Sequence, residues 1–290
     1  MIVITNKSKI KRLNRSVMGD MPIMIALYIL GAIMFLPMVY SVVMSLKPMD
    51  EIFIFPPRLT VRNPTLNNFK SLFSLMSLSW VPFTRYVYNT LLISIVGTAG
   101  HVIISSLCAY ALAKHDFIGK EFIFKMIVLS LMFSTAVTGV PNYLIMSRLG
   151  WIDSYAAVII PAFAGPLGLY LMKQFMESMV PDTLLEAARL DGAHELYIYW
   201  NIVMPTVKPA WLTLIVFSFQ GLWNMGGNAY IYSEKLKTVN YAISQILAGG
   251  ISRAGAGLAA SVVMMLVPIA VFLFSQSNIV ETMATSGMKE

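Results

Sequence analysis

The chain has 290 residues, of which 57% are hydrophobic and only 12% are charged, with a formal net charge of +7. Soluble domains carry roughly 25% charged residues, so this composition excludes an ordinary soluble enzyme and indicates an integral membrane protein. The basic residues are scattered rather than gathered into an aromatic-lined stripe, which argues against nucleic-acid binding and fits contact with membrane lipid.

The predicted elements begin with a basic arm, residues 1–20, which holds five Lys and Arg residues against one acid, Asp20. Basic residues collect on the cytoplasmic side of a membrane, so the arm places the N-terminus in the cytoplasm. Six stretches without Asp, Glu, Lys or Arg follow, and a helix needs about 20 apolar residues to cross the hydrocarbon core. The six predicted membrane-spanning helices are residues 21–46, 86–113, 126–147, 154–172, 209–233 and 254–280.

Six spans make an all-α, multi-pass membrane protein whose C-terminus returns to the cytoplasm, because only helices suit apolar runs of this length. Residues 1–85 hold the arm, the first span and an outer loop rich in proline and aromatic residues. We expect that loop to form short helices against the outer face. Residues 86–280 are predicted to form a five-helix core, and residues 281–290 a cytoplasmic tail.

A polar segment, residues 182–208, separates the fourth and fifth spans on the cytoplasmic side. Thr183 and Glu186 have the spacing of a capping box, which predicts the start of a helix. Gly192 stands where a left-handed residue would end that helix, and residues 193–201 can start a second helix before Pro205. On local physics alone, the segment is either a docking element or an amphipathic hairpin lying on the membrane surface.

The same segment contains acidic and small residues at fixed spacing, and this motif resembles one known loop. Its residues are Glu186, Ala187, Ala188, Asp191, Gly192 and Pro205. The loop it resembles is the one by which permease subunits of bacterial binding-protein-dependent ABC importers engage their ATPases. Residues 161–175 and 217–224 are similar to the carbohydrate branch of that family, on the side of the smaller permease of the maltose-type pair.

The resemblance implies a type I ABC importer permease fold in the bacterial inner membrane and a non-enzymatic role as half of a channel for a sugar or oligosaccharide. It implies four partners: a second homologous permease, two cytoplasmic ATPase subunits and an extracytoplasmic solute-binding protein. The six motif residues would then be the ATPase-coupling residues, and ATP would bind to the ATPase subunits. The C-terminal residues 277–290 differ from the Gly-Ala-rich ending usual in this branch, so the resemblance implies nothing about tail contacts.

The chemistry-bearing motifs of other protein classes are missing from the sequence. Without a Gly-x4-Gly-Lys-Ser/Thr loop, we expect no ATP site and no other bound cofactor on this chain. Without Cys/His metal spacing or a nucleophile elbow, we expect no metal ligands and no catalytic residues. His101 lies within a span, where a packed, hydrogen-bonded role is favoured over a proton relay. Gly165 and Gly168 indicate either close helix packing or a hinge.

Two rival functions stay open at this point. An ion-coupled secondary transporter usually places ionisable residues inside its spans, whereas all six predicted spans lack Asp, Glu, Lys and Arg. A membrane-embedded transferase would use paired acids near a membrane face, and four acids of segment 182–208 fit that need. These are Asp182, Glu186, Asp191 and Glu195. Their helical spacing suits docking better.

The fifth predicted span supplies candidate residues for a solute path. A sugar needs amide or hydroxyl partners and an aromatic platform, and Gln220, Trp223, Asn224 and Asn228 provide both kinds of side chain. The first three fall at i, i+3 and i+4, which is one helical face. The alternative is that these amides only bond neighbouring helices. The outer loop, residues 224–257, is either flexible or, as the resemblance suggests, enters the binding protein. The identity of the solute cannot be read from the sequence.

Overall fold

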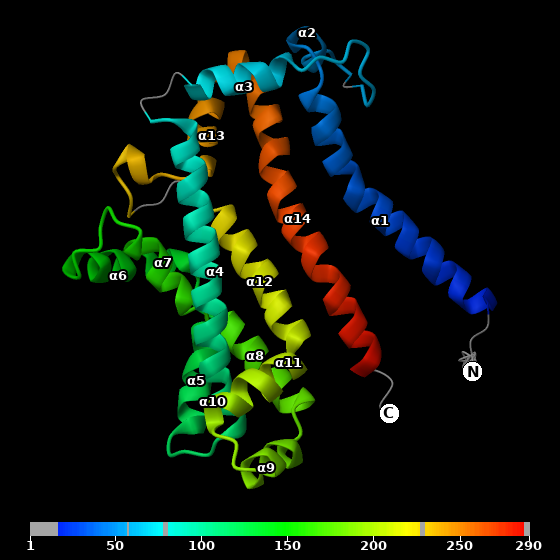
Figure 1. Ribbon diagram of the computed structural model, residues 1–290. Coiled ribbons are helices and arrows are strands. Elements are labelled where there is room, and N and C mark those ends of the chain that lie inside the picture. Colours follow the sequence, from blue (N-terminus) through cyan, green and yellow to red (C-terminus); the bar gives the residue numbers. More distant parts are fainter. Residues whose placement is uncertain (1–16, 57, 78–80, 227–229, 287–290) are drawn as a thin grey trace, which may run out of the picture.

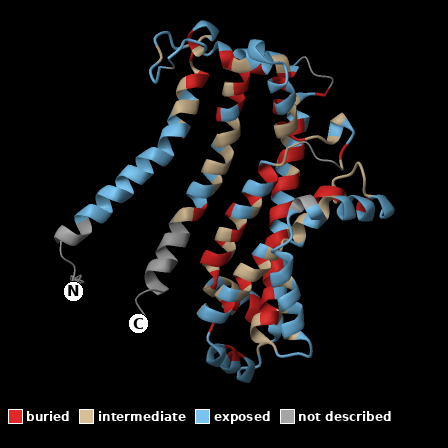
Figure 2. Ribbon diagram, turned by 180° about the vertical axis from the view of Figure 1, so that it is seen from behind, coloured by how far each residue is buried: buried red, intermediate tan, exposed pale blue. Residues whose placement is uncertain are grey.

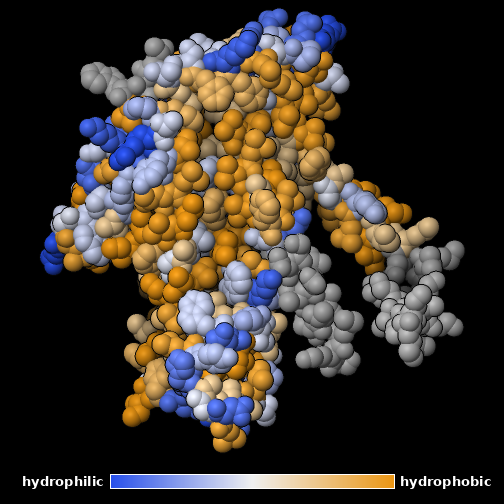
Figure 3. All heavy atoms as spheres, in the orientation of Figure 1, coloured by the Kyte–Doolittle hydropathy of each residue, from blue (hydrophilic) through white to orange (hydrophobic). Residues whose placement is uncertain are grey.

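The computed structural model describes residues 17–56, 58–77, 81–226 and 230–286, and within these ranges the regular structure is helical, without a strand. Asn228, one of the predicted path residues, lies outside the described residues. The described part confirms the all-helical prediction. Figure 3 shows an apolar belt over the middle of the molecule, with hydrophilic residues gathered toward both ends, as expected of a membrane protein.

Long apolar helices cross the molecule from end to end (Figure 1). Within the described residues, four segments are long and apolar enough to span a membrane, and a fifth is a pair of helices bent by 80°. The helices of these segments are α1 (Val17–Ser45), α4 (Phe83–Lys114), α7 (Ala156–Phe163) with α8 (Pro166–Met179), α14 (Ala254–Ser286), and, in the bent pair, α10 (Glu195–Ile198) to α11 (Met204–Thr206) followed by α12 (Lys208–Trp223). Five of the six predicted spans therefore have a helical counterpart.

The third predicted span, residues 126–147, is not one continuous helix. It is divided between α5 (Lys120–Ser130) and α6 (Thr135–Arg148), and the backbone at Ser134 is extended, with φ −76° and ψ 152°. A new helix begins at Thr135 with Ser134 in the cap position, where its side chain makes no capping hydrogen bond within the described residues. Figure 1 shows α6 pointing away from the bundle, so the predicted count of six spanning helices is not confirmed.

Short helices cover the end of the molecule where α1 finishes. They are α2 (Met49–Ile52) and α3 (Asn67–Ser77), in the loop where short helices were predicted. Asn68 ties α3 to the end of α1, because its Nδ2 donates to the carbonyls of Ser45 (2.8 Å) and Lys47 (2.7 Å). The predicted short helices are confirmed.

Helix α1 diverges from the bundle over most of its length and packs near its C-terminal end against α14, whereas α4 lies at the centre of the bundle. The most apolar window of α1 has none of its residues buried, and Figure 2 shows the helix exposed over most of its length. In α4, by contrast, 44% of the corresponding window is buried, and the helix contributes to all three core clusters through Tyr86, Ile93 and Val102. The two described chain ends lie toward the same end of the molecule (Figure 1).

Candidate functional site

Helix α9 (Asp182–Leu190) lies at the end of the molecule opposite α2 and α3 (Figure 1). It ends in a Schellman motif, in which the N–H of Gly192 donates to the Arg189 carbonyl and the N–H of Ala193 donates to the Ala188 carbonyl, both at 3.0 Å. Gly192 has a φ of +81°, a conformation that glycine adopts without the steric cost of a Cβ. The predicted left-handed end of this helix is confirmed.

The predicted capping box is wrong. The helix begins at Asp182 with Pro181 in the cap position, and among the described residues no side chain caps it. A capping box needs an N–H on the cap residue to pair with the glutamate, and proline has none. Lys114 fixes this start instead, since its Nζ donates to the Val180 carbonyl (2.6 Å) and pairs with Asp182 Oδ1 (2.7 Å).

A second helical segment follows Gly192 and runs into the fifth span. We call α9 the first arm of the site and this segment, residues 193–206, its second arm. It comprises α10, a π-helical turn over Tyr199–Val203, and α11. The N–H of Met204 donates to the Tyr199 carbonyl, five residues back, and the π-turn precedes Pro205, which lacks an N–H for the helical ladder. The chain then bends at Val207, and Pro209 occupies the first turn of α12. We call α9 to α11, residues 182–206, the coupling element.

Five of the six predicted coupling residues are exposed on this element. They are Glu186, Ala187, Asp191, Gly192 and Pro205. Ala188 is 9% exposed and packs in the core cluster with Leu185, so its small side chain faces the protein's own interior. Ala187 has exposed leucines three residues away on each side, Leu184 and Leu190, the latter 89% exposed. This spacing places a small apolar strip on the outward face of α9.

The structure reveals contacts with α4 that the sequence did not. Ser106, Tyr110 and Lys114 bind successive parts of the coupling element through Tyr199, Glu195 and Asp182. The hydrogen bond and charge of Lys114 lower the pKa of the Asp182 carboxyl below its ordinary value of 3.8. The sequence shows that Ser106, Tyr110 and Lys114 share one face of α4, because they are four residues apart. It does not show which residues that face contacts.

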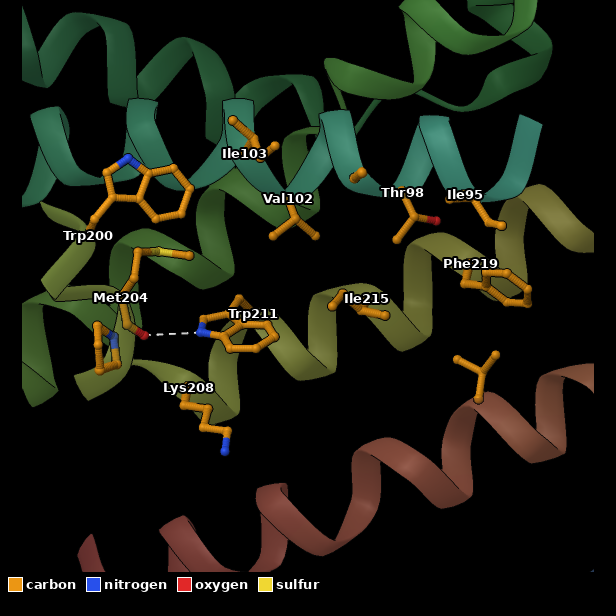
Figure 4. A pocket seen from close by; sticks show the side chains of 13 residues that line it. Ile95, Thr98, Val102, Ile103, Trp200, Met204, Lys208, Trp211, Ile215 and Phe219 are labelled. Atoms are coloured by element: carbon orange, nitrogen blue, oxygen red, sulfur yellow. Dashed lines mark hydrogen bonds between the residues drawn. The ribbon is translucent and has the colours of Figure 1, made fainter. Parts of the chain in front are cut away.

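The larger of two cavities beside α12 is an apolar groove of about 710 Å³ (Figure 4). Helix α4 forms one wall through Val102 and its neighbours, and Trp211 and Phe219 of α12 form another. The Trp211 indole N–H already donates to the Met204 carbonyl at 3.0 Å. With Thr98, Lys208 and the Trp200 indole as its further polar groups, this groove offers few partners for the hydroxyls of a sugar.

The predicted path residues divide between two environments. Gln220 and Asn224 are exposed and line a second cavity of about 510 Å³ between α12 and α14, together with Ser261. Trp223 is only 5% exposed, stacks on Phe219 with ring centroids 5.7 Å apart, and donates its indole N–H to the Met264 carbonyl. Of the residues on the predicted helical face, Gln220 and Asn224 therefore line a cavity, whereas Trp223 contacts α14. Contact between these residues and a solute stays a prediction.

His101 is a hydrogen-bonded packing residue, as predicted. Its Nδ1 lies 2.6 Å from Ser218 Oγ and its Nε2 lies 3.1 Å from the Gly165 carbonyl oxygen, so it joins α4, the α7–α8 junction and α12. A Cβ at Gly165 or Gly168 would clash with the His101 ring, which accounts for both glycines by close packing.

Comparison with known proteins assigns the chain to a family. The model of the family described as binding-protein-dependent transport system inner membrane component matches residues 101–284, which include the coupling element. The chain belongs to this family. It is a multi-pass permease component of a binding-protein-dependent importer, not an enzyme, and the secondary-transporter and transferase alternatives are excluded.

The chain is similar to several known proteins, two of which are named as permeases of transport systems. The permease is 32% identical to Protein LplC of Bacillus subtilis (strain 168) over 207 residues, which are 70% of this chain and 66% of LplC. It is 34% identical to the polygalacturonan/rhamnogalacturonan transport system permease YtcP of the same organism over 164 residues, covering 55% of this chain and 56% of YtcP. The arabinooligosaccharides transport system permease AraQ of Halalkalibacterium halodurans is 28% identical over 262 residues, covering 87% and 90%.

A solved structure shares the fold of this permease. A chain in the crystal structure of a bacterial ABC transporter involved in the import of the acidic polysaccharide alginate matches with a TM-score of 0.74 and 21% sequence identity. The match covers 91% of this permease and 98% of that chain. The predicted type I permease fold is confirmed.

Proposed function

We propose that this permease forms half of the membrane path of an ATP-driven importer for a sugar or an oligosaccharide. Two of the relatives named above are permeases of saccharide transport systems, and this supports the solute class. The proposed partners are a second homologous permease, two cytoplasmic ATPase subunits, an extracytoplasmic solute-binding protein and membrane lipid. ATP binds to the ATPase subunits, and this chain binds no cofactor.

The exposed coupling element is the observation that carries the proposal. Helix α9 presents Glu186, Ala187 and Asp191 outward, and the Schellman turn at Gly192 fixes the angle to the second arm. We assign Glu186, Ala187, Asp191, Gly192 and Pro205 to the ATPase-docking surface, with Ala188 supporting it from beneath. Both described chain ends lie toward this end of the molecule, which supports cytoplasmic termini.

Gly192→Val tests the docking. A β-branched residue at a φ of +81° costs about 1 kcal/mol or more, so the turn should open and misplace α9. We expect the variant to insert in the membrane and to lose ATPase co-purification or to hydrolyse ATP without uptake. Gly150→Val is the matched control, because Gly150 also has a positive φ (+67°) and open space around it but lies in the loop after α6. Normal ATPase binding and uptake in Gly192→Val would contradict the proposal.

Gln220 and Asn224 are proposed to line the solute path, with Trp223 supporting their helix. The variant with both Gln220→Ala and Asn224→Ala should lower uptake by about tenfold, since each lost amide removes hydrogen bonds to sugar hydroxyls. Its basal ATPase activity and assembly should be unchanged. Gln174→Ala, an exposed amide on α8, is the control. Unchanged uptake in the double variant would assign this face to helix packing alone.

A further inference from the structure

One face of α4 binds the coupling element at three points, Asp182, Glu195 and Tyr199. Ser106, Tyr110 and Lys114 are spaced by four residues, so they lie on one face over about 12 Å of helix. The hydroxyls of Ser106 and Tyr199 lie 2.6 Å apart, at the π-helical end of the element. At the other end, Lys114 Nζ lies 2.7 Å from Asp182 Oδ1, in the first turn of α9. Contacts from a single helix therefore fix both arms.

Glu195 occupies the middle of this face and uses its two oxygens for different helices. Its Oε1 accepts a hydrogen bond from Arg189 Nε at 2.8 Å, and Arg189 lies in the last turn of α9. Its Oε2 accepts a hydrogen bond from Tyr110 Oη at 2.7 Å, and His115 Nε2 lies 3.4 Å from the same oxygen. A single carboxylate thus joins α9, α10 and the inner end of α4.

Apolar packing beneath these contacts holds the second arm against α4. Ile198, Tyr199 and Val203 are buried in the same core cluster as Ala109 and Tyr110. The Tyr110 and Tyr199 rings have centroids 5.7 Å apart. Packing of this kind resists separation, whereas the directional bonds of Glu195 set the angle and register of α9 relative to α4.

We infer that Glu195 is the positioning residue that locks the coupling element to α4, so that α9 and the inner half of α4 move as one rigid body. The inference rests on the proposed docking of α9 to an ATPase. Movement imposed on α9 is then delivered directly to the central helix of the bundle, through Tyr110. The coupling element is also joined covalently to α12, but this connection bends at Val207, where the series of helical backbone hydrogen bonds is interrupted.

Two spin-label distances in the assembled importer, reconstituted with its ATPases, test this inference. The first joins the native Cys108, exposed on α4, to a cysteine replacing the exposed Thr183 of α9. The second joins Thr183→Cys to a cysteine replacing Ser244, exposed on α13 (Val239–Leu247), in a Cys108→Ser background. Both are measured without nucleotide and after trapping with ADP and vanadate.

A rigid unit predicts that the Cys108–Thr183 distance stays constant on trapping while the Thr183–Ser244 distance changes. Glu195→Gln should leave assembly intact but broaden the first distance or shift it by about 3 Å, the length of one hydrogen bond. Tyr110→Phe keeps the ring packing, removes the same hydrogen bond and should behave likewise. Asp116→Asn is the matched control, because the Asp116–Lys120 pair (3.0 Å) is exposed and local.

The outcomes separate the inference from the proposed function. A change in the Cys108–Thr183 distance on trapping of the otherwise unaltered protein would overturn the rigid unit, and an unchanged distance in both Glu195→Gln and Tyr110→Phe would overturn the role of Glu195. The proposed function, and the inference with it, would be overturned by either of two results. One is a Thr183–Ser244 distance that is the same without nucleotide and after trapping, and the other is failure of the ATPases to co-purify.

Discussion

The two ends of α4 are attached to their surroundings by different chemistry. At the N-terminal end, which is the outer end in the proposed orientation, Asn89 Nδ2 donates to the backbone carbonyls of Lys235 and Lys237, both at 2.8 Å, and Thr90 Oγ1 accepts the N–H of Val239 at 2.9 Å. These backbone contacts stand beside a side-chain bond from Tyr86 Oη to Glu234 Oε1 at 2.7 Å. At the inner end, α4 side chains mainly bind other side chains. A contact to backbone tolerates exchange of the partner's side chain, whereas a contact between side chains depends on both residues.

The two ends also differ in their exposure to water. The α4 residues themselves are buried at both ends, since Asn89, Thr90 and Ser106 are completely buried and Tyr110 is 6% exposed. The difference lies in the partners, because the side chains of Glu195 and Asp182 at the inner end are 47% and 76% exposed, whereas Val239 at the outer end is 4% exposed. Water can replace a lost partner at an exposed site but not at a buried one, so disruption should cost more at the outer end. Residues 235–239 are accordingly anchored to α4, which does not support the flexible-loop interpretation of that part of the loop 224–257.

Asn89→Ala should have the largest effect on stability. It removes the donor to the Lys237 carbonyl and the acceptor of the Tyr155 hydroxyl (2.7 Å), while the Lys235 carbonyl keeps Arg85 Nε as a donor (3.2 Å). Each buried group left unsatisfied costs about 1–3 kcal/mol. We expect a loss of roughly 3 kcal/mol or more in the free energy of unfolding, measured by denaturant titration in detergent. Asn142→Ala, an exposed asparagine on α6, should change it by less than about 0.5 kcal/mol. Equal effects of the two substitutions would remove the distinction between the ends.

Thr90→Val should have a smaller, local effect. The substitution keeps the shape of the side chain but leaves the Val239 N–H without its acceptor, at a cost of about 1–2 kcal/mol. Hydrogen exchange at the Val239 amide should accelerate by about tenfold, with less change in the helices at the inner end. Thr84→Val, at an exposed position near the start of the same helix, is the control. Unaltered protection at Val239 would show that its hydrogen bond contributes nothing to the anchoring.

Asp182→Asn should have the smallest effect, and it should depend on pH. Lys114 lowers the pKa of Asp182 in the folded protein, so the ion pair stabilises the fold above the ordinary value of 3.8, and this contribution is lost as the pH falls through the lowered pKa. The difference in unfolding midpoint between the unaltered protein and Asp182→Asn should be constant above about pH 5 and shrink below it. A difference that does not vary with pH would indicate that the contact is not ionic.

Features encoded locally could be predicted from the sequence, and features that depend on distant partners could not. Long apolar runs specified five spans, and the left-handed end of α9 followed from Gly192 alone. The capping-box spacing of Thr183 and Glu186 was misleading, because α9 begins at Asp182 after Pro181 and both residues lie inside the helix. The extended backbone at Ser134 was not predicted, because the apolar run continues through this residue without interruption.

The α4 contacts of the candidate site lay further beyond the reach of sequence patterns. Periodicity places Tyr110 on one face of α4, but its partner Glu195 is 85 residues away along the chain. Spacing also placed Trp223 beside Gln220 and Asn224, because it could not show that α14 packs against the indole. Helical spacing thus predicts which residues share a face, while tertiary packing decides what each part of that face touches.

The 80° bend at Val207 makes the segment Glu195–Thr206 a lever arm. Its twelve residues extend about 18 Å at the helical rise, so a pivot of about 10° at the bend would sweep Glu195 through about 3 Å. That arc is as long as the 2.7 Å separation of Tyr110 Oη and Glu195 Oε2. The segment therefore cannot tilt freely. A tilt of more than a few degrees must either move α4 as well or break the hydrogen bond between Tyr110 Oη and Glu195 Oε2.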